Sequence, residues 1–233
     1  MFQEECKFTF LRTMLVIILI LFVSGCATTK TQTQTPNLAQ ESVAFMTLKI
    51  SNRYKPIYQP FVDTVTVLKD NGDRLTFPVD KPYNKIETQF NEYLIIINLP
   101  AGSYKIGCLH GQSRQSPQAN DPYGYFYAPV FSNFELEQNK VVYLGHIEAT
   151  VNRRKSKDDV MAGPVVPVLD QTTTGFLMGT FEIKISDNSD EDIVIFKQKY
   201  SLPISSVEKT ILPPWKKPTG EVLYYYNLSD KKK

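Results

Sequence analysis

Apolar residues alternate with polar ones at a period of two along most of the chain beyond residue 42, and this pattern constrains the fold more than any other feature. Successive side chains of a β-strand point to opposite faces, so a period of two predicts strands with one face in a core. Strands do not alternate with helices here, which favours an antiparallel β-sandwich. The expected strands are 43–50, 62–69, 74–79, 93–99, 103–109, 126–136, 141–151, 176–185 and 222–228.

Turn-forming residues separate several of these strands. The segment 70–73 reads Asp-Asn-Gly-Asp, whose residues tolerate positive φ, and it predicts a tight hairpin. Segments 100–102 and 137–140 mark two further turns.

One short helix is expected near residues 190–200. Ser189 is a typical helix cap, and the three acidic residues after it favour the positive end of a helix dipole. The apolar face of this helix comprises Ile193, Phe196 and Tyr200.

The segment from Met14 to Val23 consists of ten apolar residues and follows two basic residues. Spanning a bilayer takes about 20 apolar residues, so this run has the length of a signal-peptide core. We interpret residues 1–25 as a lipoprotein signal peptide, with translation starting at Met1 or at Met14.

The residues Val23, Ser24, Gly25 and Cys26 resemble the bacterial lipobox, in which small residues precede an invariant cysteine. The resemblance implies that Cys26 becomes the mature N-terminus and carries a diacylglycerol. Two or three acyl chains hold a protein stably on a membrane. Ala27 implies delivery to the outer membrane, on its periplasmic face, if the cell is Gram-negative. We therefore expect a cell-envelope protein whose first partner is membrane lipid.

The chain downstream divides into three expected parts. Residues 26–42 are rich in Thr and Gln and form a flexible tether behind the lipidated cysteine. Residues 43–228 form the β-sandwich domain, and residues 229–233 form a basic tail. With Cys6 removed and Cys26 acylated, no internal disulfide is possible.

Cys108 is the remaining cysteine. It continues an alternation with Tyr104 and Ile106, so we expect a small buried core residue rather than a nucleophile.

Three segments, 99–106, 134–136 and 140–145, resemble prealbumin-like (transthyretin-like) or carboxypeptidase-regulatory-like sandwich domains. In those domains a Pro-Gly turn launches a strand, and a later edge carries an aromatic-Leu-Gly sequence. The resemblance covers residues 43–200 and implies an antiparallel β-sandwich. Members of these families are mostly non-enzymatic, so no catalytic residue carries over.

Histidines and acidic residues supply the candidates for chemistry. His110 and His146 titrate near neutrality and would be the acid-base groups of a hydrolase, but no Gly-x-Ser-x-Gly sequence accompanies them. A calcium loop would use Asp187, Asp190 and Asp192, but Gly at the sixth position and Glu at the twelfth are missing. We interpret this acidic stretch as a turn and helix cap, and we expect no metal and no cofactor.

Charge excludes one class of partner. The chain has 26 basic and 24 acidic residues, a balance too even for a nucleic-acid-binding protein. The basic residues of 153–157 precede Asp158 and Asp159, so we expect a solvated loop with nearly cancelling charges rather than a phosphate-binding patch.

Two long connections, 111–124 and 152–175, are the expected places for function or disorder. The apolar segment 163–169 within the second is expected to cover a sheet edge, and the alternative is that it serves as a contact surface. The first leads into an aromatic cluster that either contacts a ligand or partner or packs ordinarily within a strand. The cluster consists of Tyr123, Tyr125, Phe126 and Tyr127.

Together these features predict a membrane-anchored lipoprotein of the cell envelope that acts as a non-catalytic binding or structural module. Its partner would be an envelope protein or the cell wall. The alternatives are a lipoprotein subunit of a secretion or envelope complex and a hydrolase that uses His110 or His146.

Overall fold

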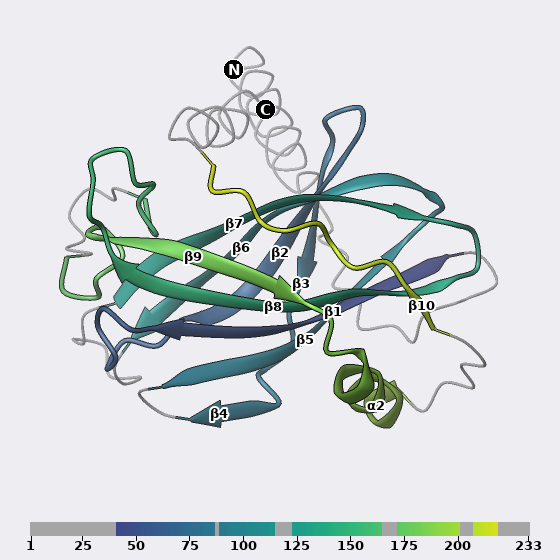
Figure 1. Cartoon of the computed structure of the whole chain (residues 1–233), viewed down its shortest axis with the longest axis horizontal. Helices are drawn as coiled ribbons and strands as arrows, with labels where there is room; N and C mark the ends of the chain where they lie inside the picture. The colour runs from purple at the N-terminus through teal and green to yellow at the C-terminus, as the bar shows by residue number, and fades with distance from the viewer. Residues whose placement is uncertain (1–40, 87–88, 115–122, 165–171, 201–206, 219–233) are drawn as a thin grey trace, which may run out of the picture. The chain divides into compact units, whose positions relative to one another are not determined.

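Two β-sheets face each other across an apolar core in the computed structural model of this chain (Figure 1). The structure describes residues 41–86, 89–114, 123–164, 172–200 and 207–218, all within one compact unit that spans residues 34–233. The signal segment, Cys26, most of the tether, the expected strand 222–228 and the basic tail lie outside the described residues.

Six strands form the larger sheet, in the order β10-β8-β1-β5-β4, with β9 also paired to β8. The bounds are β1 Ser42–Asn52, β4 Asn84–Ile86, β5 Phe90–Leu99, β8 Val141–Arg153, β9 Gly179–Ser186 and β10 Glu208–Lys209. The smaller sheet has the order β3-β2-β6-β7. Its bounds are β2 Phe61–Lys69, β3 Arg74–Pro78, β6 Gly102–Arg114 and β7 Tyr123–Leu136.

The expected fold class is confirmed: the chain is mostly β, its strands form a sandwich, and one short helix, α2 Ser189–Tyr200, follows β9. The strand pairing is mixed rather than purely antiparallel as expected, because β1 and β10 both run parallel to β8. The pair is parallel because β8, which follows the short β7–β8 connection out of the four-stranded sheet, begins at the same end of the sandwich as β1.

The core lies between the sheets and contains buried side chains from both. Met46, Leu48 and Ile50 of β1 face Val65 and Val67 of β2 across it. The hydroxyl of a core tyrosine, Tyr93, accepts a hydrogen bond from the Val62 backbone N–H at 3.0 Å. Burial raises the pKa of this phenol to about 12.

The hairpin expected at 70–73 is confirmed by the antiparallel pairing of β2 with β3. Gly72 has φ of +85°, and its N–H donates to the Lys69 carbonyl at 2.9 Å. Asn71 supports the turn by accepting the Asp73 backbone N–H at 3.0 Å.

Cys108 is buried, as expected, but it faces the other side of the sheet. A register shift lies between Ile106 and Cys108 in the β6–β7 pairing and between Ile106 and Leu109 in the β2–β6 pairing. Ile106 therefore faces the core between the sheets, whereas Cys108 packs with Tyr127 and Val160 in a small separate cluster. The backbone of Cys108 exchanges two hydrogen bonds with the Thr66 hydroxyl, which holds the irregular strand in place.

The two ends of the sandwich differ in their connections. At one end, the turn end, short turns join β5 to β6 and β7 to β8, and β1 begins at Ser42. At the other, the loop end, β1, β6 and β8 finish and longer connections follow them, including 53–60 and 154–178. Figure 1 shows residues 53–60 and the described parts of the second connection, 154–164 and 172–178, together at the left of the view.

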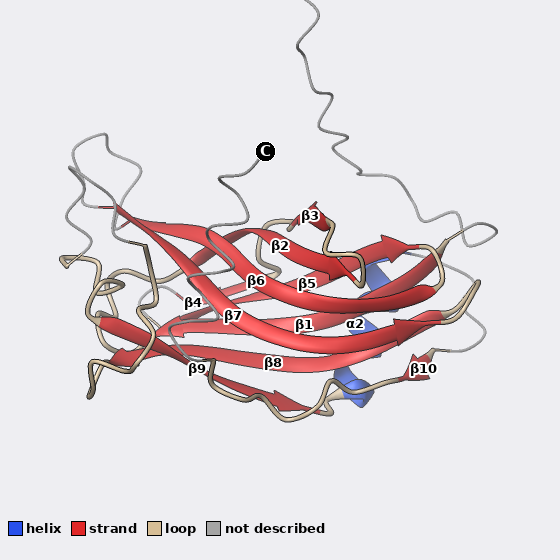
Figure 2. Ribbon diagram, turned by 90° about the horizontal axis from the view of Figure 1, so that it is seen from above, coloured by secondary structure: helices blue, strands red, loops and turns tan. Residues whose placement is uncertain are grey.

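Helix α2 lies on the face of the six-stranded sheet that points away from the four-stranded sheet (Figure 2). Among the residues that the structure describes, no helix has the length and apolar composition needed to cross a membrane.

Candidate functional site

A β-bulge in β8 places two polar side chains on the same face of the six-stranded sheet. Phe45 pairs with Tyr143 and Thr47 pairs with His146, so β8 has one more residue than β1 between these positions. Gly145 lies within this bulge and has a φ of +114°, a backbone conformation that L-amino acids other than glycine rarely adopt. Strict alternation would have placed Tyr143 and His146 on opposite faces; the bulge turns both towards α2.

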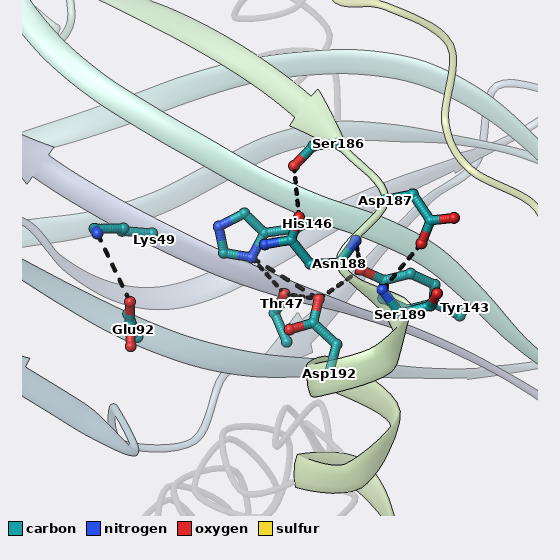
Figure 3. A network of polar contacts seen from close by, with 10 residues as sticks. All are labelled: Thr47, Lys49, Glu92, Tyr143, His146, Ser186, Asp187, Asn188, Ser189 and Asp192. Carbon is teal, nitrogen blue, oxygen red and sulfur yellow. Dashed lines mark hydrogen bonds and ion pairs between the residues drawn. The ribbon is translucent and has the colours of Figure 1, made fainter.

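Asp192 of α2 meets these residues in a buried polar cluster (Figure 3), which we define as Thr47, Tyr143, His146 and Asp192. The Asp192 carboxylate accepts hydrogen bonds from the Thr47 hydroxyl and, at 2.5 Å, from the Tyr143 hydroxyl. The His146 Nδ1 lies 2.7 Å from the Thr47 oxygen and 3.8 Å from Asp192 Oδ2.

These contacts assign the protons. The Thr47 hydroxyl donates its hydrogen bond to Asp192, so its oxygen accepts the hydrogen bond from His146, and Nδ1 of the imidazole carries the proton of that bond. Burial and the hydrogen bond to Asp192 raise the pKa of the Tyr143 hydroxyl, which therefore stays protonated as a donor. The Tyr143 oxygen also accepts the Asn188 backbone N–H at 3.2 Å.

Apolar contacts hold the same helix beside the cluster. Phe196 is fully buried and stacks on Phe45, with ring centroids 4.1 Å apart and planes inclined by 8°. Such a pair contributes about 0.5–1.5 kcal/mol beyond its burial. The expected inward face of the helix is confirmed, because Ile193 and Tyr200 pack against the apolar group of side chains that includes Phe45 and Phe196.

The cap of α2 differs in detail from the expectation. Ser189 does not act as the cap; its own backbone N–H donates to the Asp187 carboxylate at 2.9 Å. The Asn188 carbonyl accepts the N–H of Asp192 at 3.0 Å, so the helix begins from Asn188. Asp187 thus stabilises the first turn, and hydrogen bonds from the side chain and the backbone N–H of Ser189 lower the pKa of Asp187.

The geometry separates the three residues weighed as calcium ligands. Asp192 points into the buried cluster, whereas Asp187 caps the helix and lies 3.7 Å from the Lys209 ammonium. Asp190 is exposed in the first turn. In the part of the chain that the structure describes, no group of three potential ligands is close enough to hold a metal ion.

His110 and His146 belong to different sheets. His110 lies half-buried on β6, where it pairs with Thr64 of β2 and Tyr127 of β7. His146 lies on β8, within the buried cluster. The two histidines therefore do not form a common site.

The aromatic stretch of β7 alternates between the two faces of its sheet. Phe126 is a core residue, packed against Phe176 and Phe181, which is the alternative of ordinary strand packing. Tyr127 is also buried, under Val160. Tyr125 is 44% exposed. The side chain of Tyr123 lies outside the described residues.

The segment 160–163 links the edges of the two sheets. The Tyr127 N–H of β7 donates to the Ala162 carbonyl at 2.9 Å, and the Ala162 N–H donates to the Gly179 carbonyl of β9 at 2.8 Å. This covering of an edge resembles what was expected for 163–169, most of which lies outside the described residues.

Sequence reasoning named His146 and Asp192 but did not connect them, and it missed Thr47 and Tyr143. Each lies in a strand whose pattern reports only burial, so no local signal distinguishes them. Neither a protein-family model nor a curated protein nor a solved structure matches the chain.

Proposed function

We propose that this chain is a lipid-anchored module of the cell envelope that works by binding or by assembly rather than by catalysis. Cys26, in its lipobox-like context, supplies the anchor, and the β-sandwich supplies the binding surface. The prealbumin-like assignment of that sandwich remains a prediction.

The proposal depends on the direction in which β1 runs through the sandwich, from the turn end to the loop end. The chain enters the sandwich at Ser42, at the turn end, and β1 then runs 11 residues to the loop end. At about 3.3 Å per residue this strand covers roughly 35 Å. A tether of about 16 residues adds a root-mean-square distance of roughly 20–24 Å. The loop end is thus the end of β1 opposite the point at which the chain from Cys26 enters the sandwich.

The contacts of the buried cluster support a non-catalytic role. Asp192 and the Nδ1 of His146 have their hydrogen bonds within the protein, and these bonds join α2 to β1 and β8. The cluster therefore attaches the helix to the sheet.

Metabolic labelling tests the anchor. Cells that express the full chain are grown with an alkyne fatty acid, and the protein is analysed by in-gel fluorescence, detergent partitioning and intact mass. We expect label on the wild type and on Cys108→Ser, and none on Cys26→Ser. Cys108→Ser is the matched control because it also removes one thiol. Wild-type protein without label, and with residues 1–25 retained, would contradict the proposal.

A further inference from the structure

Basic residues from two distant parts of the sequence converge at the loop end. β1 and β8 run parallel, with Asn52 paired to Val151, so the two strands finish side by side. The Arg53 backbone N–H donates to the Val151 carbonyl at 3.0 Å, which extends the pairing past the end of β1. The exposed side chains of Arg53 and Arg153 follow directly.

The segments that leave the two strands add further cations. Residues 53–55 and 153–159 are all described, and together they contain six Lys or Arg and two Asp. An antiparallel pair would have sent these segments to opposite ends of the sheet. The parallel pairing therefore creates a concentration of positive charge that neither segment has alone.

Cancellation of this charge by the neighbouring acids is incomplete. The Asp159 carboxylate accepts the backbone N–H groups of Lys155 at 2.8 Å and Ser156 at 3.0 Å, and it is ion-paired with Lys217. These contacts lower its pKa. Asp159 is thus bound within its own loop and to a cation from the C-terminal segment, so it does not neutralise the arginines.

Exposed carbon lies beside these cations. The Lys55 ammonium is 5.6 Å from the centre of the Tyr54 ring, and Ile57 of the same loop is 48% exposed. Gly175 of the neighbouring loop packs so closely that a Cβ on it would lie 2.6 Å from Lys55 Cγ. The surface therefore combines positive charge with the exposed aliphatic side chain of Ile57 and the half-buried ring of Tyr54.

We propose that the loop end binds an acidic polysaccharide, with Arg53 and Arg153 pairing with its anionic groups and the Tyr54–Ile57 loop contacting its sugar rings. Charge complementarity selects an anionic partner, because planar guanidinium groups pair well with carboxylate or phosphate. The exposed carbon favours a sugar polymer over a membrane surface, since sugar rings present apolar faces to aromatic side chains. The inference rests on the proposed function and names its partner class.

The test uses the full-length acylated protein in nanodiscs of zwitterionic lipid. Binding is measured by biolayer interferometry to immobilised polygalacturonate, a carboxylated polysaccharide, with neutral dextran and anionic phosphatidylglycerol vesicles as comparison surfaces. We expect binding to polygalacturonate alone, weakening as sodium chloride rises from about 50 to about 200 mM.

The double variant Arg53→Gln/Arg153→Gln should weaken binding by about tenfold or more at the lower salt, since each cation near an anionic surface contributes about fivefold. The matched control, Lys69→Gln/Lys81→Gln, removes the same charge from exposed positions outside the loop end and should bind within about twofold of the wild type.

Equal affinity of the arginine variant and the wild type would overturn the inference, and so would equal binding to dextran. Capture by the vesicles without binding to polygalacturonate would overturn it in favour of a membrane surface. The fatty-acid label on Cys26 measures acylation in a separate experiment. Failure of the anchor and failure of this inference are therefore distinguishable.

Discussion

Asp192 is a buried carboxylate whose hydrogen bonds come from hydroxyls on the sheet beneath it. Thr47 and Tyr143 both donate to it, and Tyr143 in turn accepts the Asn188 N–H ahead of the helix. A buried donor that loses its acceptor costs about 1–3 kcal/mol. Asp192 therefore makes the hydrogen bonds by which the buried cluster attaches α2 to the sheet.

We expect Asp192→Ala to lower the free energy of unfolding by about 2–4 kcal/mol, because it leaves two buried hydroxyls without their acceptor. The measurement is urea unfolding followed by circular dichroism. Asp190→Ala removes an exposed acid from the same helical turn and should cost less than about 1 kcal/mol. Equal losses from the two variants would show that the cluster does not hold the helix.

The burial of single residues was predicted better than the face they occupy. Cys108 is buried as its pattern indicated, but a register shift turns it away from Ile106. His146 shares a face with Tyr143 for the same kind of reason. A bulge depends on how two strands pair, and one strand's alternation does not contain that information.

At the scale of elements, β8 is the strand on which the site depends. Its bulge is accommodated by Gly145, where an added Cβ would lie 3.2 Å from the Ser186 carbonyl and 3.3 Å from Ile211 Cγ2. The neighbouring strand and the C-terminal segment therefore both pack closely against this glycine.

Gly145→Ala should lower the free energy of unfolding by about 2–3 kcal/mol, since it combines an unfavourable backbone conformation with close contacts. Gly72→Ala is the matched variant: its φ is also positive, but its Cβ would have no atom within 4 Å. We expect it to cost about 1 kcal/mol. Thermal unfolding of both proteins measures the difference, and a smaller loss at Gly145 would contradict the close packing.

Elements with local signals were predicted well. The 70–73 hairpin and α2 are specified by turn residues, charges and spacing that lie next to one another in the chain. β10 was missed, because two residues have no period and this strand exists only through its pairing with β8.

At the scale of the whole described domain, the C-terminal segment 207–218 joins the two sheets. Thr210 and Leu212 donate their N–H groups to the carbonyls of Tyr143 and Leu144, each at 2.9 Å. The Trp215 Nε1 then donates to the Pro129 carbonyl of β7 at 2.8 Å. The segment thus bonds to β8 of one sheet and β7 of the other.

Leu212 is the buried anchor of this segment. Leu212→Ala should lower the free energy of unfolding by about 2–4 kcal/mol through lost burial and the cavity that remains. Lys216→Ala, at an exposed position of the same segment, should change it by less than about 0.5 kcal/mol. Guanidinium unfolding measures both. A Leu212 variant as stable as the wild type would mean that the segment does not contribute to closing the sandwich.

The sequence by itself determined the fold class, the short helix, the main hairpin and the burial of Cys108, because each follows from side-chain periodicity or from turn chemistry within a few residues. The tertiary structure alone decided that β1 lies parallel to β8, that a bulge joins His146 and Tyr143 to Asp192, and that arginines a hundred residues apart share one end of the sandwich. These features depend on strand pairing, and the energies that select one register come from side chains that are distant in the chain.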